Sequence, residues 1–454
     1  MISIIKSKEK NINSLLIFSL LAAMVFFLNT PANATNKPLT KPIKHQTQEI
    51  HTSAAISSNP AAVNVGTGSG AVQRYVEKKL DIKNDHGIAV QGAWIGDTNQ
   101  LFSGGIPDAE RNTLNSVLIL DLLVDTEKFN KWKGGLMGAQ FLQINTQNTN
   151  GEAGNIQGYN SLPGPPPLNR SELYELWYRQ AFFDNKLYVR VGKTVTTLDF
   201  NNVIKPAPLN QGAPTIPAVT SLLFTPIFTN TSMLGVVPGF YNSAYGVTIN
   251  FTPVRNWYLS YGIYDGNLAS GKQTGLTGPT FNGSYYHIAE TGAAWLIGKN
   301  QLPGNVGIGA WHQKGLILQP PLSEQNASGA YIFGAQRLWY RNPGYDSSGV
   351  SAFYQYGINN SSALPMKQYI GAGLTAFGLI DNRANDSFGA GVAFSSLNQK
   401  SFQRPNELMY QVYYQAQIID AIYIEPALSY IPNPGASIGL SPAWAGTLRA
   451  IVLF

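Results

Sequence analysis

From Gly87 onward the sequence repeats short segments in which consecutive side chains alternate between two faces. A β-strand places successive side chains on opposite sides of a sheet, so this two-residue period predicts strands. Gly, Asn, Pro, Asp and Ser separate the segments, as expected for turns and loops. Sixteen strands are predicted, over residues 87–98, 112–124, 134–147, 171–184, 186–197, 243–252, 255–265, 284–297, 304–314, 329–340, 347–358, 367–380, 385–397, 406–418, 420–431 and 444–454.

The segment 171–184 indicates what kind of sheet these strands form. One of its faces carries Glu175, Trp177 and Arg179, and the other carries Tyr174, Leu176, Tyr178 and Phe182. A soluble sandwich would have to bury one of these faces, whereas a membrane-spanning barrel presents its apolar face to lipid and its polar face to a water-filled lumen. We therefore predict an all-β fold, a transmembrane antiparallel barrel of about sixteen strands over residues 87–454.

Neighbouring segments divide their faces in the same way, with one exception. In 186–197 and 255–265 the inward side includes Tyr188, Arg190, Tyr258 and Tyr264. In 331–341, however, Arg337 falls on the same face as Phe333 and Trp339. Either a β-bulge intervenes or the assignment of the faces is mistaken there, and the sequence leaves both alternatives open.

The predicted connections also differ in length. Residues 251–257 and 418–423 read as tight turns, whereas 148–170 and 206–238 are long and rich in proline. Membrane barrels have short turns at the periplasmic rim and longer loops at the outer rim. We therefore expect the first two connections in the periplasm and the last two outside the cell.

The first 34 residues have the pattern of a secretory signal peptide. Three lysines precede an apolar run over 15–28, and Ala32-Asn33-Ala34 supplies a small-x-small cleavage site. The run is too short to span a bilayer as a helix. Residues 35–86 are rich in Thr, Ser, Asn, Pro and Ala and are interpreted as a flexible periplasmic leader, with a candidate short helix at 71–80. The sequence therefore predicts that the chain is exported from the cytoplasm.

Composition excludes several other classes of protein. Charged residues make up only 12% of the chain and cysteine is absent, so no disulfide can hold this exported fold together. Most of the basic excess lies before residue 87, which argues against nucleic-acid binding. The five histidines are scattered, so neither a metal site nor a cofactor is predicted. Residues 435–439 match G-x-S-x-G, but no histidine follows His312, and an enzyme is not predicted.

Residues 171–200, SELYELWYRQAFFDNKLYVRVGKTVTTLDF, resemble the signature ELWYEQ…F.D.KL.LRVGK of the carbohydrate-selective porins of the OprB type. Three further stretches are similar to that family: VDTEKFNKWKGGLMGAQFLQIN at 124–145, the 80–94 strand with its Gly-Ile, and IEPALSYIPNPGAS at 424–437. The resemblance extends from about residue 70 to the C-terminus.

The resemblance implies a sixteen-stranded outer-membrane barrel, monomeric, that passes monosaccharides such as glucose by facilitated diffusion. It also implies a constriction narrowed by inward-folded loops and lined by arginine, glutamate and aromatic residues. We expect a loop within 206–238 to fold inward. The family commonly has Glu where this chain has Arg179, so the family's substrate preference does not transfer without a test.

A sugar offers hydroxyl groups that donate and accept hydrogen bonds, and an apolar C–H face that packs on aromatic rings. The candidate pore-lining residues that supply these groups are Glu175, Trp177, Arg179, Tyr188, Arg190, Asp199, Glu425 and Arg449. The alternative is that they brace the barrel interior through ion pairs. Asp199 could equally anchor the long loop that follows it.

The predicted function is passive diffusion of small neutral carbohydrates. A channel for other small polar or acidic solutes is the alternative if Arg179, Arg190 and Arg449 cluster without carboxylates. An exported β-rich surface binding protein is a different class, and it requires strands packed on both faces. The expected partners are outer-membrane lipid and, through the terminal Phe454, the machinery that assembles outer-membrane barrels.

Overall fold

The computed structural model describes residues 87–163, 167–201, 231–235, 243–254, 256–266, 278–281, 283–319, 321–343, 346, 348–419 and 421–453. Its strands are β1 (Ile88–Ser103), β2 (Asn112–Asp125), β3 (Gly135–Asn145), β4 (Asn169–Phe182), β5 (Leu187–Thr194), β6 (Ala244–Val254), β7 (Trp257–Asp265), β8 (Tyr285–Ile297), β9 (Leu302–Gln319), β10 (Leu322–Tyr340), β11 (Gly349–Asn359), β12 (Met366–Phe377), β13 (Ser387–Leu397), β14 (Asn406–Ile419), β15 (Ile422–Ile431) and β16 (Ala443–Leu453). Short helical segments are α3 (Thr126–Asn130), α4 (Thr149–Glu152), η3 (Thr196–Leu198) and α6 (Thr231–Leu234). The predicted signal peptide and leader, and Phe454, lie outside the described residues.

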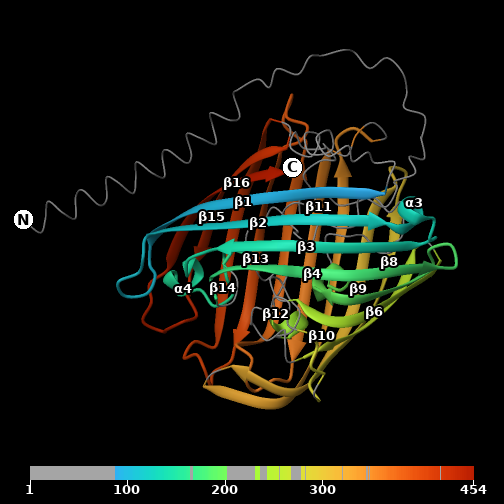
Figure 1. Cartoon of the computed structure of the whole chain (residues 1–454). Helices are drawn as coiled ribbons and strands as arrows, with labels where there is room; N and C mark the ends of the chain where they lie inside the picture. The colour runs from blue at the N-terminus through green and yellow to red at the C-terminus, as the bar shows by residue number, and fades with distance from the viewer. Residues whose placement is uncertain are drawn as a thin grey trace, which may run out of the picture.

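The strands close into one antiparallel barrel. Each pairs with its neighbours in sequence, and β1 pairs with β16, which places Asp97 opposite Arg449. Every strand of this barrel therefore has a partner on both sides, and none of the described strands is left as an open sheet edge. Figure 1 shows β1–β4 crossing the strands behind them at a steep angle, as strands do when they tilt relative to a barrel axis. The predicted fold class is confirmed.

The two rims of the barrel differ in their connections. One rim has only short turns, and the predicted tight turns between β6 and β7 and between β14 and β15 are found there. At the other rim, residues 146–168 connect β3 to β4 and residues 195–243 connect β5 to β6. No helix in the described residues is long and apolar enough to cross a membrane.

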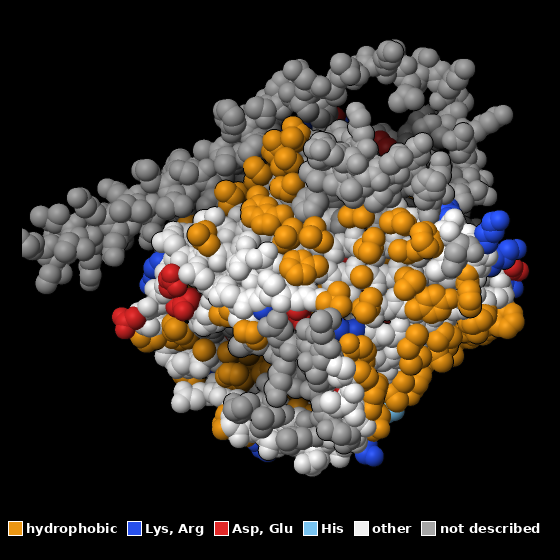
Figure 2. All heavy atoms as spheres, in the orientation of Figure 1, with side chains coloured by type: hydrophobic (Ala, Val, Ile, Leu, Met, Phe, Trp, Pro, Cys, Tyr) orange, Lys and Arg blue, Asp and Glu red, His pale blue; other side chains and the backbone are white. Residues whose placement is uncertain are grey.

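The outward side chains form an apolar belt. On β7, Trp257, Leu259 and Tyr261 are 42%, 46% and 42% exposed, whereas Tyr258 and Ser260 between them are 2% and 1% exposed. Figure 2 shows hydrophobic side chains gathered in a broad band across the visible face, with most charged side chains nearer its two ends. This is the surface that lipid contacts in a transmembrane barrel. The predicted division of faces holds for β7.

A β-bulge overturns one predicted orientation. The register between β3 and β4 shifts so that Tyr174 becomes an extra residue between Leu173 and Glu175. Tyr174 is consequently 3% exposed and packs in a cluster with inward residues such as Ile144. The prediction that Tyr174 faces lipid is wrong, because the bulge turns it to the same side as Glu175.

A second bulge explains the exception in β10. The register between β10 and β11 shifts between Arg337 and Trp339. Phe333 and Arg337 are each 2% exposed, whereas Leu338 and Trp339 are each 48% exposed. The bulge is therefore the correct alternative, and it turns Trp339 to the outer surface.

β9 and β10 are longer than the alternation predicted. Their extra residues pair with each other in a hairpin, and a register shift lies between Glu324 and Asn326. The Glu324 carboxylate accepts a hydrogen bond from the backbone N–H of Ser362 (2.8 Å), in the loop between β11 and β12. Alternation does not reveal the extension, since strands beyond the lipid belt need no apolar face.

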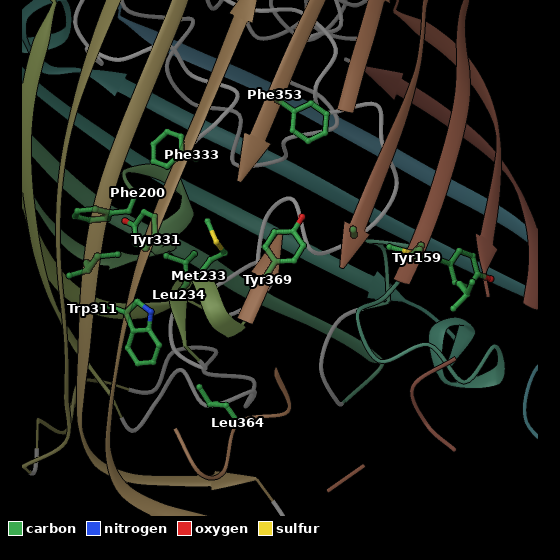
Figure 3. Packing of buried hydrophobic residues seen from close by; sticks show 14 of the residues in the cluster. Tyr159, Phe200, Met233, Leu234, Trp311, Tyr331, Phe333, Phe353, Leu364 and Tyr369 are labelled. Carbon is green, nitrogen blue, oxygen red and sulfur yellow. The ribbon is translucent and has the colours of Figure 1, made fainter. Parts of the chain in front are cut away.

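Two segments from the outer-rim loops lie inside the barrel. α6 contacts β10, β11 and β12, and Figure 3 shows its Met233 and Leu234 near Trp311, Tyr331 and Tyr369. This helical turn belongs to the stretch 206–238 that we expected to fold inward, and most of that stretch lies outside the described residues. The second segment, residues 149–162, is called the strap below.

Candidate pore-lining site

The predicted pore-lining residues fall into two groups on the inner wall. The first, which we name the β4–β5 cluster, consists of Glu175, Trp177 and Arg179 on β4, Tyr188 and Arg190 on β5, and Asp199 directly after η3. The second, the seam cluster, consists of the predicted residues Glu425 on β15 and Arg449 on β16, together with Asp97 on β1, which was not predicted. The name refers to the β1–β16 pairing that closes the barrel. The structure thus brings six of the eight together and places the other two elsewhere on the wall.

Backbone pairing organises the β4–β5 cluster. β4 and β5 are antiparallel neighbours, and their register sets Arg179 opposite Arg190. The Arg190 guanidinium forms an ion pair with the Asp199 carboxylate. Glu175 accepts hydrogen bonds from the backbone N–H of Val195 (2.9 Å) and the hydroxyl of Thr194 (3.2 Å). Both carboxylates therefore hold the chain where it leaves β5 toward the long loop.

Aromatic rings lie against both guanidinium groups of this cluster. The Arg190 guanidinium lies 5.4 Å from the centre of the Trp177 ring, and that of Arg179 lies 5.3 Å from the centre of the Tyr188 ring. Such cation–π contacts stabilise a charge without neutralising it. Glu175 Oε2 and the Nε atoms of both arginines have no hydrogen-bond partner among the described residues. The cluster thus combines charge, unused hydrogen-bonding atoms and aromatic faces.

Glu290 of β8 extends this part of the wall, and the sequence did not single it out. Its carboxylate accepts hydrogen bonds from the hydroxyls of Tyr258 (2.6 Å) and Tyr331 (2.7 Å). It also accepts one from the backbone N–H of Asn201 (2.6 Å), two residues after Asp199. Glu290 thereby fixes the start of the long loop to the wall formed by β7, β8 and β10.

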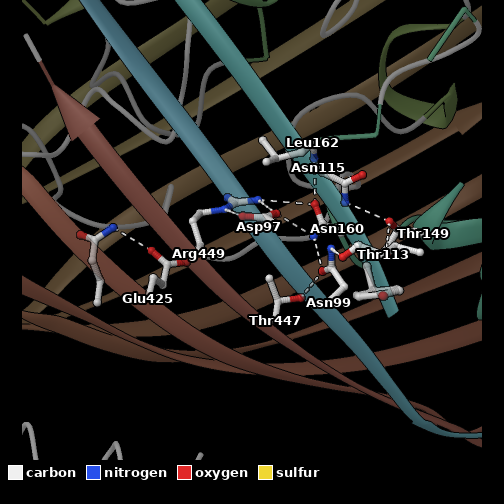
Figure 4. A network of polar contacts seen from close by, with 12 residues as sticks. Asp97, Asn99, Thr113, Asn115, Thr149, Asn160, Leu162, Glu425, Thr447 and Arg449 are labelled. Carbon is white, nitrogen blue, oxygen red and sulfur yellow. Dashed lines mark hydrogen bonds and ion pairs between the residues drawn. The ribbon is translucent and has the colours of Figure 1, made fainter. Parts of the chain in front are cut away.

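The seam cluster is an ion pair braced by the strap. The Arg449 guanidinium makes two hydrogen bonds to the Asp97 carboxylate, of 2.7 and 2.8 Å. Asn160 of the strap donates to Asp97 Oδ2 and to Asn99 Oδ1, each at 2.8 Å. Figure 4 shows this network, with Glu425 beside Arg449. Glu425 accepts from the amide of Gln415 (2.7 Å), and its Oε1 atom has no partner among the described residues.

The strap follows β3 in the sequence, and Glu407 of β14 holds it against the inner wall. The Glu407 carboxylate accepts hydrogen bonds from the side chain of Asn155 (2.8 Å) and from the backbone N–H groups of Ile156 (3.0 Å) and Gln157 (2.8 Å). It accepts another from the N–H of Gly435 (2.6 Å), between β15 and β16. One carboxylate therefore joins two loops to the wall.

The strap also buries a tyrosine hydroxyl within the barrel. Tyr159 is 2% exposed, and its carbonyl accepts a hydrogen bond from Gln411 of β14 (3.0 Å). Burial, followed by the nearby charge of Asp97, raises the pKa of Tyr159, so this side chain stays neutral. The strap therefore places a packed, neutral tyrosine over this part of the wall.

Three carboxylates that organise the inner wall were not predicted from the sequence: Asp97, Glu290 and Glu407. Each lies at an inward position of a strand that the alternation did predict. A charged residue on the inward face of each strand was the available signal in the sequence. The described residues contain no group of three or more His, Cys, Asp or Glu that could hold a metal ion.

A closed, sixteen-stranded antiparallel barrel with an apolar belt and charged residues on its inner wall defines the porin class of bacterial outer-membrane channels. The family model described as "Carbohydrate-selective porin, OprB family" matches residues 117–452. The chain belongs to this family, which is not enzymatic.

Individual relatives agree with this assignment. The chain is similar to Porin B of Pseudomonas aeruginosa, with 22% identity over 442 residues that cover 85% of this chain and 89% of that protein. The high-pH structure of Pseudomonas putida OprB superposes with a TM-score of 0.68 at 16% identity, covering 84% of this chain and 97% of that one. The low-pH structure of the same porin gives a TM-score of 0.51 at 16% identity, covering 85% and 98%. At this identity the two structures show the fold alone.

Proposed function

We propose that the chain is a monomeric passive channel for small neutral carbohydrates, such as glucose, and that the β4–β5 cluster contacts the sugar. The observation that carries the proposal is the contact of Trp177 with Arg190 beside the carboxylates of Glu175 and Asp199. These groups match the hydroxyls and the C–H face of a pyranose. Membership of a carbohydrate-selective family supports the same substrate class.

The ion pairs of Arg190 and Arg449 favour neutral solutes over acidic ones beside these two arginines. An acidic solute would be favoured if Arg179, Arg190 and Arg449 gathered without carboxylates. Instead, Arg190 has Asp199 and Arg449 has Asp97 as partner. Paired charges still polarise a hydroxyl group, but they offer little net attraction to an anion. Each contact must also be weak enough to release the solute.

Liposome swelling and planar-bilayer conductance test this function. Vesicles that contain the protein are expected to swell in glucose, and glucose is expected to reduce the ion current through single channels. Because Glu175 and Trp177 supply an acceptor and a ring face, Glu175→Ala and Trp177→Ala are expected to raise the half-blocking glucose concentration about five-fold each.

Asp381→Asn is the matched control for these variants, because this carboxylate is 84% exposed on a short turn and pairs with Arg341 outside the lumen. It is expected to leave glucose block unchanged. Absence of glucose-dependent swelling in the unmodified protein would reject the proposed function. Unchanged block in both cluster variants would remove the β4–β5 cluster from the sugar path.

A further inference from the structure

Cations on the inner wall differ in whether a carboxylate accompanies them. Arg190 and Arg449 have aspartate partners, and Arg170 and Lys193 share Glu172 at 3.4 and 3.7 Å. Within the described part of the chain, no carboxylate lies within ion-pair distance of Arg179 or Arg337. We call these two residues the exit arginines.

The exit arginines lie near the same rim. Arg179 is three residues before the end of β4, and Arg337 is three residues before the end of β10. Even-numbered strands of this barrel end at the rim with short turns, which is the periplasmic rim of an outer-membrane porin. Both side chains follow the inward alternation of their strands, after Trp177 and Ala335 respectively. A solute that has passed the ion pair of Arg190 with Asp199 therefore meets them last.

The polar atoms of the exit arginines are incompletely used. Arg179 Nε, and both Nε and Nη1 of Arg337, are buried without a hydrogen-bond partner among the described residues. The register places Ser351 directly opposite Arg337, and its hydroxyl also has no partner there. Buried donors without acceptors cost free energy, so such a group calls for an explanation.

The chemistry of these groups selects an oxyanion. A guanidinium group presents several N–H donors and no acceptor, in a planar fork that fits a carboxylate. Each exit arginine lies over a tyrosine ring, Arg179 at 5.3 Å from Tyr188 and Arg337 at 5.0 Å from Tyr340. The rings hold the cations in place and leave their positive charge available. Ser351 adds a hydroxyl that can bond to a carboxylate oxygen or to a sugar hydroxyl.

We propose that the exit arginines bind the carboxylate of a sugar acid at the periplasmic end of the lumen. The proposal rests on the proposed carbohydrate channel and extends its substrates from neutral monosaccharides to their carboxylate derivatives. Binding is reversible and changes no covalent bond. The paired charges of the two clusters accept the sugar hydroxyls, and the unpaired charges near the exit attract the acid group.

Planar-bilayer recordings on the full chain, with gluconate and glucose as blockers of chloride current, test the proposal. The ratio of the half-blocking concentration of gluconate to that of glucose is the readout, because damage to the pore as a whole moves both concentrations together. Gluconate is expected to block the unmodified channel at the lower concentration. Arg337→Gln and Arg179→Gln are each expected to raise the ratio about three- to five-fold, since each removes one positive charge that attracts the carboxylate.

Arg341→Gln is the matched control, because Arg341 follows β10 on the rim and pairs with Asp381 (2.5 Å) outside the lumen. Arg337→Lys keeps the charge and is expected to restore part of the ratio, and normal heat-modifiable migration on gels will show that each variant is folded. An unchanged ratio in folded Arg337→Gln and Arg179→Gln overturns the proposal. If glucose fails to block the unmodified channel, the proposed carbohydrate function fails, whatever the ratio.

Discussion

The β4–β5 cluster and the seam cluster both pair an arginine with an aspartate, but the aspartate comes from a different distance along the sequence in each. Arg190 and Asp199 are 9 residues apart, and Asp199 follows η3 at the start of the long loop. Arg449 and Asp97 are 352 residues apart and meet only where β16 pairs with β1. The first pair therefore depends on the local path of one loop, and the second on closure of the whole barrel. Similar chemistry thus serves to position a loop in one case and to join the ends of the sheet in the other.

The largest expected effect is on stability, at the seam. Asp97→Ala leaves the Arg449 guanidinium buried without its carboxylate, and both side chains are at most 1% exposed. We expect this change to lower the free energy of unfolding by about 3–5 kcal/mol, because the buried guanidinium loses both hydrogen bonds to its ion-pair partner. Urea unfolding of the refolded barrel in detergent micelles, followed by tryptophan fluorescence, measures it.

Asp199→Ala is the comparison for that experiment, since it removes the partner of Arg190 in the same way. We expect a smaller loss, because Asp199 lies after η3 and belongs to none of the paired strands. If both variants lose the same free energy of unfolding, the Arg449–Asp97 pair is no more important for closing the barrel than the Arg190–Asp199 pair is for holding the loop. The double variant Asp97→Asn with Arg449→Gln is expected to recover part of the loss, since it removes both charges.

An effect of intermediate size is expected when the strap loses its hydrogen bonds to Glu407. Glu407→Ala removes the acceptor for Asn155, Ile156 and Gln157, and leaves buried N–H groups unsatisfied. Each such group costs about 1–3 kcal/mol, so the strap is expected to detach from β14 without unfolding of the barrel. Protease cleavage within 149–162 and swelling of vesicles in disaccharides are both expected to increase.

Asp381→Asn serves as the control for the strap as well, because it removes an exposed carboxylate far from it in the sequence. If Glu407→Ala shows the same cleavage and the same size limit as the unmodified protein, the strap does not depend on Glu407. In that case the hydrogen bonds from Asn160 to Asp97 and Asn99 are sufficient to hold the strap in place.

The sequence predicted the barrel well because a membrane imposes a simple rule on every strand. Lipid on one side and water on the other force a period of two, and this pattern located all sixteen strands. It failed at Tyr174, because one extra residue in β4 reverses the alternation locally. It also missed the ends of β9 and β10, where the hairpin leaves the lipid belt and the rule no longer applies.

The candidate site was harder to predict, because its geometry depends on contacts between distant parts of the chain. Arg449 was singled out, but its partner Asp97 could not be, since the pairing requires the closed register of β1 with β16. Glu407 escaped for a similar reason: its partners lie in a loop more than 200 residues earlier. Inward charge is visible in the sequence, whereas the identity of its partner is a property of the closed fold.

The smallest expected effect concerns Asp199→Asn. This change removes the negative charge that pairs with Arg190 and keeps the size of the side chain. The amide oxygen still accepts a hydrogen bond from Arg190, so stability is expected to change by less than about 1 kcal/mol. The freed positive charge is expected to make the channel more anion-selective, shifting the reversal potential in a KCl gradient. Asp97→Asn should shift that potential less, since Arg449 is held at the barrel seam and Asn160 already covers it. A larger shift of the reversal potential from Asp97→Asn than from Asp199→Asn would mean that the seam cluster, and not the Arg190–Asp199 pair, faces the path of the ions.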